Sequence, residues 1–371
     1  MSHRNMRRIA TKLTAWFARN ARDLPWRRTR DPYAVWISEI MLQQTQVKTV
    51  IPYFERWMRA LPTVEAFARA PLAGILKLWE GLGYYRRVRN AQAAARHIVN
   101  GRAGRFPEAF EDLLALPGVG RYTAGAIASI AFNQPAPILD GNVMRVLSRL
   151  FGVAGNPRGK AVNTKLWALA RELVSVRGIE PSQLNQALME LGALVCLPRQ
   201  PKCAACPVRR DCFARREKRV GEFPAPAPRT PVRRRRFIAF VVRRGVRCLV
   251  RRRPHGEVNG GLWEFPNIEI PVNTKNPAAK TAPYSIAPGG PFCRVRHTIT
   301  NNRILLEAFR ATLIHQRGLR GAWKTIEEAG RLPFTSAHRK VLEAVSVMLK
   351  SPINSPATPA KSPRCSGCRT D

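Results

Sequence analysis

The stretch LPGVGRYTAGAIASIAF, residues 116–132, decides the fold of the N-terminal half of this chain. Its proline ends a preceding helix, Gly118 and Gly120 bracket a tight turn, and a second helix follows directly, so the stretch predicts a helix–hairpin–helix. Glycines at the turn let a phosphate approach the backbone, and the free N–H groups of the second helix attract an anion. Because Arg121 adds a positive charge, we expect Gly118, Gly120 and Arg121 to contact a DNA backbone. A plain turn between two helices is the simpler alternative.

The rest of the chain divides around this motif, and its 371 residues have room for two or three domains. Residues 1–220 carry apolar side chains at helical spacing between proline and glycine breakers, which predicts an all-α domain. Residues 221–236 are rich in proline and then arginine, as linkers are. Residues 237–349 begin with strand-like segments and end in a predicted helix, which indicates a smaller α+β domain. Residues 350–371 have the composition of a disordered tail.

The charge is strongly basic: 63 Lys and Arg against 24 Asp and Glu give a formal net charge of +39. Such an excess is typical of proteins that bind nucleic acid. A biased genomic base composition would explain why arginine outnumbers lysine, but not why acids are scarce. The longest apolar runs are about six residues, far short of the ~20 that span a bilayer, and the N-terminus lacks the apolar core of a signal peptide. We therefore expect no membrane partner.

Four of the eight cysteines fall in one window with the spacing C-x6-C-x2-C-x5-C: Cys196, Cys203, Cys206 and Cys212. A secreted disulfide scaffold would spread its cysteines through a short chain, whereas clustering in a long chain indicates a metal site in a reducing cytosol. Structural zinc usually joins two close-spaced cysteine pairs across a longer loop. Four cysteines are also the ligand set of a [4Fe–4S] cluster. From ligand chemistry alone both metals stay open.

Two carboxylates stand in sequence contexts that suit acid–base chemistry. Glu39 lies in DPYAVWISEIMLQQTQV among apolar residues, where burial raises the pKa of a carboxyl towards neutrality. Asp140, in PAPILDGNVMRVLSRLF, precedes a predicted helix whose N-terminus favours the ionised form. An acid and an ionised partner are the pair expected to cleave a glycosidic bond. A buried structural glutamate and a simple helix cap are the alternatives for each residue taken alone.

Taken together and in this order, these segments resemble the endonuclease III superfamily, and most closely its adenine-specific branch, the MutY family. The similarity runs through RDLPWR, ISEIMLQQTQV, LWEGLGYYRRVRN, LPGVGRYTAGAI, ILDGNVMRVLSRLFGV and LNQALMELGALVC, and continues more weakly in GGLWEFP. The resemblance implies a multi-domain protein: an all-α helix–hairpin–helix glycosylase domain with a [4Fe–4S] loop, followed by a smaller α+β Nudix-like domain. It also implies that the four cysteines hold a [4Fe–4S] cluster.

The resemblance further implies an adenine-specific DNA N-glycosylase of base excision repair. Such enzymes flip adenine, mispaired with 8-oxoguanine or guanine, out of double-stranded DNA and hydrolyse its N-glycosidic bond. Glu39 matches the general acid that protonates adenine N7, and Asp140 matches the carboxylate that stabilises the cationic sugar. The other matches are Tyr122 and Asn142 beside Asp140, Arg27 and Gln186 in the adenine pocket, Gln44 and Tyr84 as wedges in the base stack, and Arg145 as a link from the active-site helix to a cluster thiolate.

Position 122 separates this branch from its lyase-active relatives, which carry there the lysine that forms a Schiff base. A tyrosine cannot form that imine, so we expect an abasic site as the product. One alternative is a bifunctional endonuclease III-like glycosylase and lyase, which Tyr122 disfavours. An alternative of another class is a non-catalytic iron–sulfur DNA-binding protein, and the presence of both Glu39 and Asp140 argues against it.

The second domain resembles the Nudix-like 8-oxoguanine reader of the family. No run of paired acids follows GGLWEFP, so we expect binding without hydrolysis there. The family's reader loop usually carries Phe-Ser-His, where this chain has Ile299-Thr300-Asn301. Thr300 keeps a hydroxyl and Asn301 offers a donor and an acceptor, so we expect both to contact the lesion. We further expect a monomer, located in a bacterial cytoplasm and associated with the nucleoid through DNA, with no metal bound by the tail cysteines Cys365 and Cys368.

Overall fold

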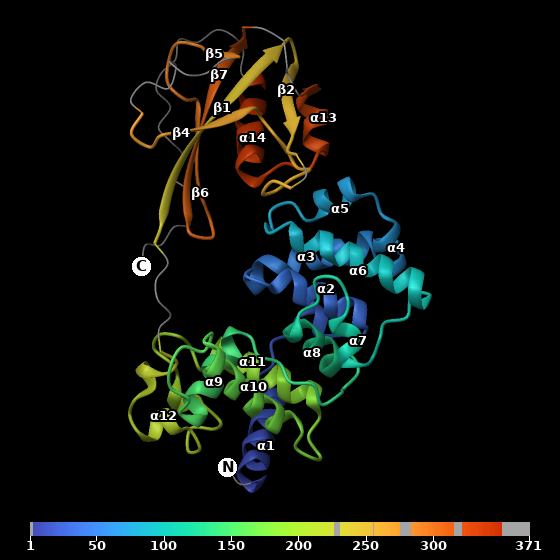
Figure 1. Cartoon of the computed structure of the whole chain (residues 1–371), viewed down its shortest axis with the longest axis vertical. Helices are drawn as coiled ribbons and strands as arrows, with labels where there is room; N and C mark the ends of the chain where they lie inside the picture. Colours follow the sequence, from blue (N-terminus) through green and yellow to red (C-terminus); the bar gives the residue numbers. More distant parts are fainter. Residues whose placement is uncertain (1–2, 226–230, 255, 275–282, 315–320, 351–371) are drawn as a thin grey trace. The chain divides into compact units, whose positions relative to one another are not determined.

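The computed structural model describes residues 3–225, 231–254, 256–274, 283–314 and 321–350 (Figure 1). The chain divides into two compact units, Met1–Pro231 and Val232–Asp371. The predicted linker, residues 221–236, is wrong at its end, because Arg233 to Arg236 already belong to the first strand of the second unit. These arginines pair along a neighbouring strand, which composition alone did not show. The predicted tail, including Cys365 and Cys368, lies outside the described residues.

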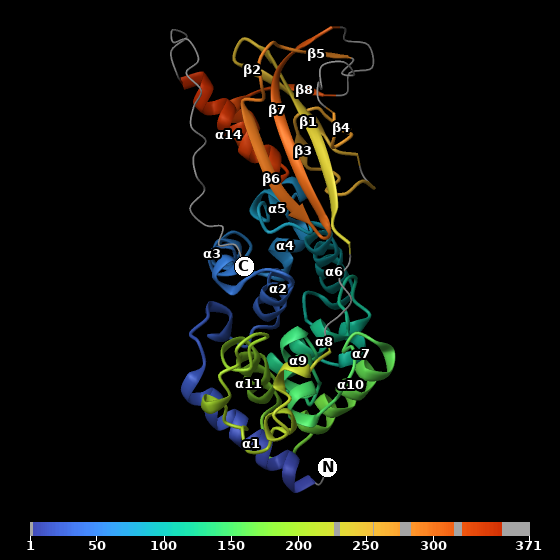
Figure 2. The same cartoon turned by 90° about the vertical axis from the view of Figure 1, so that its left-hand side faces the viewer.

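The first unit is helical, as the sequence predicts (Figures 1 and 2). Its helices are α1 (His3–Asn20), α2 (Pro32–Leu42), α3 (Val47–Ala60), α4 (Val64–Arg69), α5 (Leu72–Leu78), α6 (Arg86–Arg102), α7 (Phe110–Leu114), α8 (Arg121–Ile130), α9 (Gly141–Phe151), α10 (Lys160–Val174), α11 (Pro181–Leu194) and α12 (Phe213–Arg216). Among the described residues, none of the helices is both long and apolar enough to cross a membrane.

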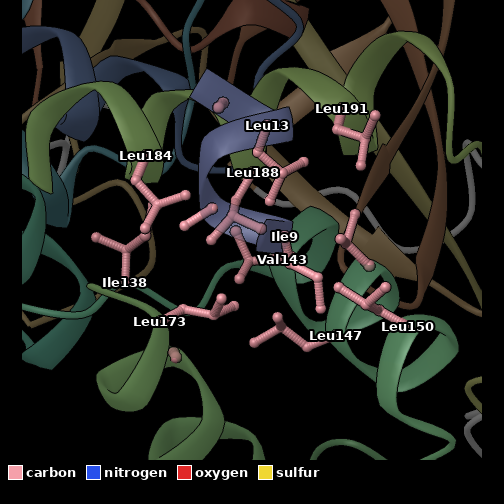
Figure 3. Packing of buried hydrophobic residues seen from close by; sticks show 14 of the residues in the cluster. Ile9, Leu13, Ile138, Val143, Leu147, Leu150, Leu173, Leu184, Leu188 and Leu191 are labelled. Carbon is pink, nitrogen blue, oxygen red and sulfur yellow. The ribbon is translucent and has the colours of Figure 1, made fainter. Parts of the chain in front are cut away.

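One hydrophobic core joins the first helix to helices from the second half of the unit. Figure 3 shows Ile9 and Leu13 of α1 pointing towards Val143 and Leu147 of α9 and Leu188 of α11. All of these side chains are buried. Burying apolar surface is the main favourable contribution to folding, so this core fixes α9 against α11 and α10. As a result the N-terminus of α9, where Asp140 lies, has a defined position.

Aromatic side chains fill the interior of the region formed by α2 to α6. The ring of Trp57 is 4.9 Å from that of Phe67 and 5.7 Å from that of Trp79, each in an edge-to-face arrangement. Such pairs add to the stability gained from burial alone. Helix α2 is buried along nearly its whole length and packs against both this region and α8. A residue in the middle of α2, such as Glu39, is therefore held deep inside the unit.

The predicted helix–hairpin–helix consists of α7, a turn and α8. Gly118 has a φ of +75°, a left-handed conformation that a side chain disfavours. A Cβ on Gly118 would also lie 2.5 Å from the Cβ of Asn90 on α6. Gly120, by contrast, is the N-cap of α8 with a φ of −92°, and a Cβ there would meet nothing within 4 Å. The two glycines of the motif therefore have different structural requirements.

The second unit is a mixed sheet with two helices, which confirms the predicted α+β class (Figure 1). Its central strands, β1 and β7, run parallel, and the other strand pairs are antiparallel. Helix α14 packs on one face through Val341, Leu342 and Val345 (Figure 2). The elements are β1 (Arg233–Arg244), β2 (Arg247–Arg252), β3 (Trp263–Glu264), β4 (Asn267–Ile270), β5 (Tyr284–Ile286), β6 (Cys293–Ile299), β7 (Asn302–Leu313), β8 (Ala322–Thr325), α13 (Ile326–Arg331) and α14 (Ser336–Lys350).

Candidate active site

A cavity of about 410 Å³ in the first unit gathers all the predicted catalytic residues and both predicted adenine-pocket residues. Its walls come from α2, α8, α9 and α11 and from the segments that precede and follow α2. A cavity of this size suits one small planar ligand. The predicted site residues that line it are Arg27, Glu39, Gln44, Tyr122, Asp140, Asn142 and Gln186.

Glu39 occupies the cavity wall because α2 carries it there. The helix begins at Asp31, whose carboxylate accepts hydrogen bonds from the backbone N–H groups of Tyr33 and Ala34, both at 3.1 Å. Glu39 follows two turns later and is 5% exposed. Burial raises its pKa to about 7, although a hydrogen bond from Tyr122 acts in the opposite direction. At neutral pH the carboxyl therefore exists in both protonation states, as a general acid requires.

Tyr122 is the direct partner of Glu39. Its hydroxyl donates a hydrogen bond of 2.6 Å to Glu39 Oε2 and lies 3.4 Å from the sulfur of Met189. Burial, and then the two neighbouring carboxylates, raise the pKa of Tyr122 well above its usual value. The phenol therefore stays neutral and remains a hydrogen-bond donor. The sequence placed Tyr122 beside Asp140, and the structure adds its bond to Glu39.

Asp140 is the N-cap of α9. Its Oδ1 accepts a hydrogen bond of 2.7 Å from the N–H of Val143, and its Oδ2 accepts one of 3.0 Å from the amide of Asn142. The sequence predicts that this position lowers the pKa of Asp140, and the direction is wrong. Burial raises the pKa of Asp140, and the bonds from Val143 and Asn142 oppose that effect. The hydrogen bonds at the N-terminus of α9 reduce the rise in the pKa of Asp140 that burial causes, but they do not cancel it.

A buried glutamate that the sequence did not single out holds two arginine side chains in the wall of the cavity. Glu190 of α11 accepts hydrogen bonds from Arg22, at 2.8 and 2.7 Å, and from Arg27, at 3.1 and 2.9 Å. Burial would raise the pKa of Glu190, but these hydrogen bonds outweigh it and lower the pKa to about 2. Glu190 therefore stays ionised and fixes Arg27 in the wall. A lone acid in the apolar stretch LMELGALV was the signal that could have revealed it.

The predicted wedge residues both adopt left-handed backbone conformations. Gln44 follows α2 with a φ of 58° and lines the cavity. Tyr84 precedes α6 with a φ of 46°, is 44% exposed and does not line the cavity. Such conformations cost free energy for a residue with a side chain, so surrounding contacts must hold them. Gln186 of α11 lines the cavity, and its amide nitrogen is 3.3 Å from the hydroxyl of Ser182.

The four clustered cysteines lie in the loop after α11. Cys196, Cys206 and Cys212 pack against the core that surrounds α9, and the thiols are close enough to influence one another's ionisation. Arg145 was predicted to reach a cluster thiolate, and this is wrong in detail. Its guanidinium donates to the backbone carbonyl of Cys196 at 2.7 Å and to Asn142 Oδ1 at 2.8 Å. Arg149, one turn further along α9, reaches the sulfur of Cys196 at 3.4 Å.

The reader-loop residues belong to the second unit. Thr300 and Asn301 form the two-residue connection between β6 and β7, since Ile299 and Asn302 are the last paired residues. Thr300 is exposed and has a φ of 55°. The carbonyl of Asn301 accepts a hydrogen bond of 2.9 Å from the N–H of Arg233. The tip of this hairpin is therefore tied to the start of β1.

The comparisons with protein families define the class. Residues 37–172 match the HhH-GPD superfamily base excision DNA repair protein, and residues 238–344 match the NUDIX domain. A solved thermostable thymine-DNA glycosylase is similar over 58% of this chain and 98% of its own, with a TM-score of 0.53 and 31% identity. Fold and site thus define a DNA glycosylase of the helix–hairpin–helix type, with DNA as its partner.

The curated relatives define the family within that class. Adenine DNA glycosylase of Rattus norvegicus is 36% identical over 89% of this chain and 76% of its own length. The human enzyme of the same name is 40% identical, and the match covers 69% of this chain and 56% of that protein. The chain belongs to the adenine DNA glycosylase family, and its activity is that of an adenine-specific DNA N-glycosylase in base excision repair.

Proposed function

We propose that this enzyme acts on adenine mispaired with 8-oxoguanine or guanine in double-stranded DNA, and that it works as a monomer which hydrolyses the bond and does not cut the strand. The observation that carries the proposal is the buried pair of Glu39 and Tyr122 in the same cavity as Asp140. This arrangement offers one proton donor and one carboxylate to a single flipped nucleotide.

Glu39 supplies the proton that makes adenine a good leaving group. With a pKa of about 7 it retains a proton in part of the molecules at neutral pH. Transfer of this proton to adenine N7 lets the bond between N9 and the sugar C1′ break with a neutral base as the product. A water molecule then bonds to C1′, and the proton that it releases restores Glu39. Tyr122 holds the carboxyl in place throughout, because its hydroxyl contacts the oxygen Oε2.

Asp140 stabilises the cationic sugar that forms as the base departs. Both of its oxygens are held by donors, from Val143 and Asn142, so the carboxylate does not need to reorient when charge develops. A developing cation also favours the ionised form of Asp140, against the effect of burial on its pKa. Arg27 and Gln186 line the space that adenine would occupy, and Glu190 fixes Arg27 there.

A hydrolytic outcome follows from the residues of the cavity wall. Tyr122 stands at the position of the Schiff-base lysine in lyase-active relatives, and no lysine lines the cavity within the described part of the chain. Without an amine, an imine to the sugar cannot form. The proposed product is therefore an abasic site in an intact strand.

Recognition of the base opposite adenine is proposed for the second unit. Its match to the NUDIX domain supports a nucleotide-binding role, and the hairpin tip, with Thr300 exposed and Asn301 half-buried, carries side chains that donate and accept hydrogen bonds. The segment after Trp263-Glu264 has no run of acids to hold catalytic metals. We therefore assign binding without hydrolysis to this unit.

We also propose that Cys196, Cys203, Cys206 and Cys212 hold a [4Fe–4S] cluster. Four cysteines are the ligand set of such a cluster, and Cys196, Cys206 and Cys212 pack together against the core around α9. When bound, the cluster would fix the shape of this loop and offer a thiolate to Arg149. Arg199, Lys202, Arg209 and Arg210 would then present a basic surface to phosphate.

The experiment that tests this function is single-turnover release of adenine from defined duplexes. Adenine opposite 8-oxoguanine, guanine or thymine would be compared for the full chain. The proposal expects release opposite the first two bases and little opposite thymine. Equal release from all three duplexes would contradict the proposed specificity.

A further inference from the structure

One guanidinium binds both of the segments that carry the wedge residues. Arg87 lies in the first turn of α6, and its side chain extends towards the end of α2. Within the part of the chain that the structure describes, it bonds to backbone carbonyls and to no side-chain oxygen. Nη1 donates to the carbonyls of Ile40 at 2.6 Å, Met41 at 3.3 Å and Gln43 at 2.6 Å, and Nη2 donates to those of Leu82 at 3.1 Å and Gly83 at 3.2 Å.

Two of these carbonyls belong to the peptide groups that lead into the left-handed residues. The carbonyl of Gln43 precedes Gln44, and that of Gly83 precedes Tyr84. A side chain in the left-handed region costs free energy, so surrounding contacts must hold it there. Arg87 supplies such a contact on both sides. It therefore sets the orientation of both residues and the spacing between the two segments.

The environment of Arg87 is costly for a cation, which argues against a passive role. The side chain is largely buried, and burial lowers its pKa to about 10, so it remains charged at neutral pH. Among the described residues no carboxylate forms an ion pair with it. Its charge is instead offset by the carbonyls at the C-terminal end of α2 and by the rings of Trp79 and Tyr84, at 5.3 and 5.5 Å.

We propose that Arg87 is a positioning residue that holds Gln44 and Tyr84 at the spacing required for both to enter the base stack together. This inference rests on the proposed function, in which these two side chains act as wedges. The segments are 40 positions apart in the sequence, and they must act at one mispair. A lysine cannot replace the guanidinium, because a single ammonium does not reach five carbonyls on two segments. Arg87 acts through the wedges and does not contact the reacting atoms.

The test compares Arg87→Met and Arg87→Lys with a matched control on the same helix. Arg96 also donates from α6 to a backbone carbonyl, that of Ala68 at 3.1 Å, but its segment carries no wedge residue. Single-turnover rates would be measured on adenine opposite 8-oxoguanine in a full duplex, and on the same adenine in a bubble of unpaired bases. Unpaired bases cost least to extrude. On the duplex we expect a loss of about tenfold or more for Arg87→Met and a smaller loss for Arg87→Lys.

The bubble distinguishes positioning from a general structural role. We expect most of the lost rate of Arg87→Met to return on the bubble, and we expect Arg96→Met to match the unaltered chain on both substrates. Equal losses on duplex and bubble would overturn the proposal, and so would an unchanged rate on the duplex. If Arg87→Met does not fold, a double-mutant cycle of Arg87→Lys with Gln44→Ala decides. The proposal requires that the two losses are not additive, and additive losses would contradict it.

A fluorescence measurement separates this inference from the proposed function. A 2-aminopurine beside the mispair reports unstacking when the enzyme binds, whether or not a base is released. The inference expects a rise in fluorescence with the unaltered chain and with Arg96→Met, and a weaker rise with Arg87→Met at saturating protein. A full rise with Arg87→Met would overturn it. Absence of base release by the unaltered chain, together with the expected fluorescence pattern, would contradict the proposed function alone.

Discussion

At the scale of single residues, the chemistry depends on how two carboxyl groups are buried. Glu39 is surrounded by the apolar side chains of α2 and meets one neutral donor, Tyr122. Asp140 is buried as well, but it meets a backbone N–H and a side-chain amide. The surroundings of Glu39 favour its protonated form. The donors around Asp140 stabilise its ionised form and so reduce the effect of burial. Two carboxylic acids of similar intrinsic strength can therefore take different roles in one cavity.

Replacement of either carboxyl by its amide should remove base release. Glu39→Gln loses the proton donor, and Asp140→Asn loses the charge that offsets the cationic sugar, so each should lower the single-turnover rate by about a hundredfold or more. Binding to the mispaired duplex should change little, because neither group is proposed to hold the DNA backbone. Retention of most of the activity by either variant would contradict its assigned role.

The pH dependence should report the bond between Tyr122 and Glu39. Base release requires protonated Glu39, so the rate should fall as pH rises through about 7. The hydroxyl of Tyr122 lowers the pKa of Glu39, and its loss in Tyr122→Phe should move this fall to higher pH by up to about one unit. Tyr53→Phe is the control, because that hydroxyl bonds to the carbonyl of Glu80 at 2.8 Å. A fall at the same pH in Tyr122→Phe and the unaltered chain would argue against Glu39 as the group that titrates.

The sequence predicted the residues whose local context is informative and missed those defined by tertiary contacts. Glu39 and Asp140 stand out because an acid among apolar residues, or before a helix, is unusual on its own. Glu190 carries a similar signal, an acid in the apolar stretch LMELGALV, and was overlooked, whereas Arg87 and Arg149 have no local signal. Arg149 contacts Cys196, 47 positions away, and Arg87 contacts backbone carbonyls such as that of Ile40, also 47 positions away, which a sequence does not reveal. The pKa of Asp140 was predicted in the wrong direction because the depth of burial also depends on the fold.

At the scale of elements, the helix–hairpin–helix places α8 so that Tyr122 enters the cavity while the preceding turn stays at the surface. The sequence predicted the order of turn and helix correctly, because glycine and proline determine such turns locally. It could not predict which helices pack together. The contacts of α2 with α8, and of α9 with α11, bring Glu39 and Asp140 into one cavity, and these depend on matching apolar surfaces.

The two glycines of the hairpin form a matched pair for testing the turn. Gly118→Ala must adopt a left-handed conformation and place its Cβ against Asn90, so we expect the unfolding free energy to fall by roughly 1–3 kcal/mol. Gly120→Ala has a permitted φ and open space, so its stability should change little. Thermal unfolding measures the difference. Equal stability of the two variants would contradict this account of the turn.

The cysteine loop after α11 can be tested through its metal content. Cys203→Ser should lose iron together with most of the DNA affinity, because the basic side chains of the loop would no longer be held in one shape. Cys248→Ser is the control, since that cysteine is buried in the core of the second unit. Metal analysis of the purified proteins measures the change. Stoichiometric zinc without iron, in a fully active protein, would contradict the cluster.

At the scale of the whole molecule, a helix–hairpin–helix glycosylase unit and a NUDIX unit share one chain. The composition predicted both, since strand-like segments follow a helical region. The boundary was less accurate, because the arginines of residues 233–236 suit both a linker and an exposed strand. The net charge of +39 should make DNA binding steeply dependent on salt, whatever the base pair. We therefore propose that selectivity comes from the cavity and from the hairpin that carries Thr300 and Asn301.

Removal of the second unit should reduce the preference for 8-oxoguanine. A chain ending at Pro231 keeps Phe223, which packs against Phe213 and accepts a hydrogen bond from Arg149. We expect it to release adenine from both mispairs, with a several-fold smaller difference between them than the full chain shows, as the loss of one or two hydrogen bonds implies. The full chain with both Thr300→Ala and Asn301→Ala should lose part of its preference for adenine opposite 8-oxoguanine over adenine opposite guanine. An unchanged preference after truncation would exclude this unit as the lesion reader.

The central claim is that Glu39, Tyr122 and Asp140 release adenine by hydrolysis and leave the strand intact. The most direct test is a single-turnover assay on a duplex with adenine opposite 8-oxoguanine, in which free adenine and strand cleavage are both followed, with and without alkali. The account predicts that adenine is released and that the strand breaks only after alkali is added. Strand cleavage without alkali at the rate of base release, or no release of adenine at all, would contradict it.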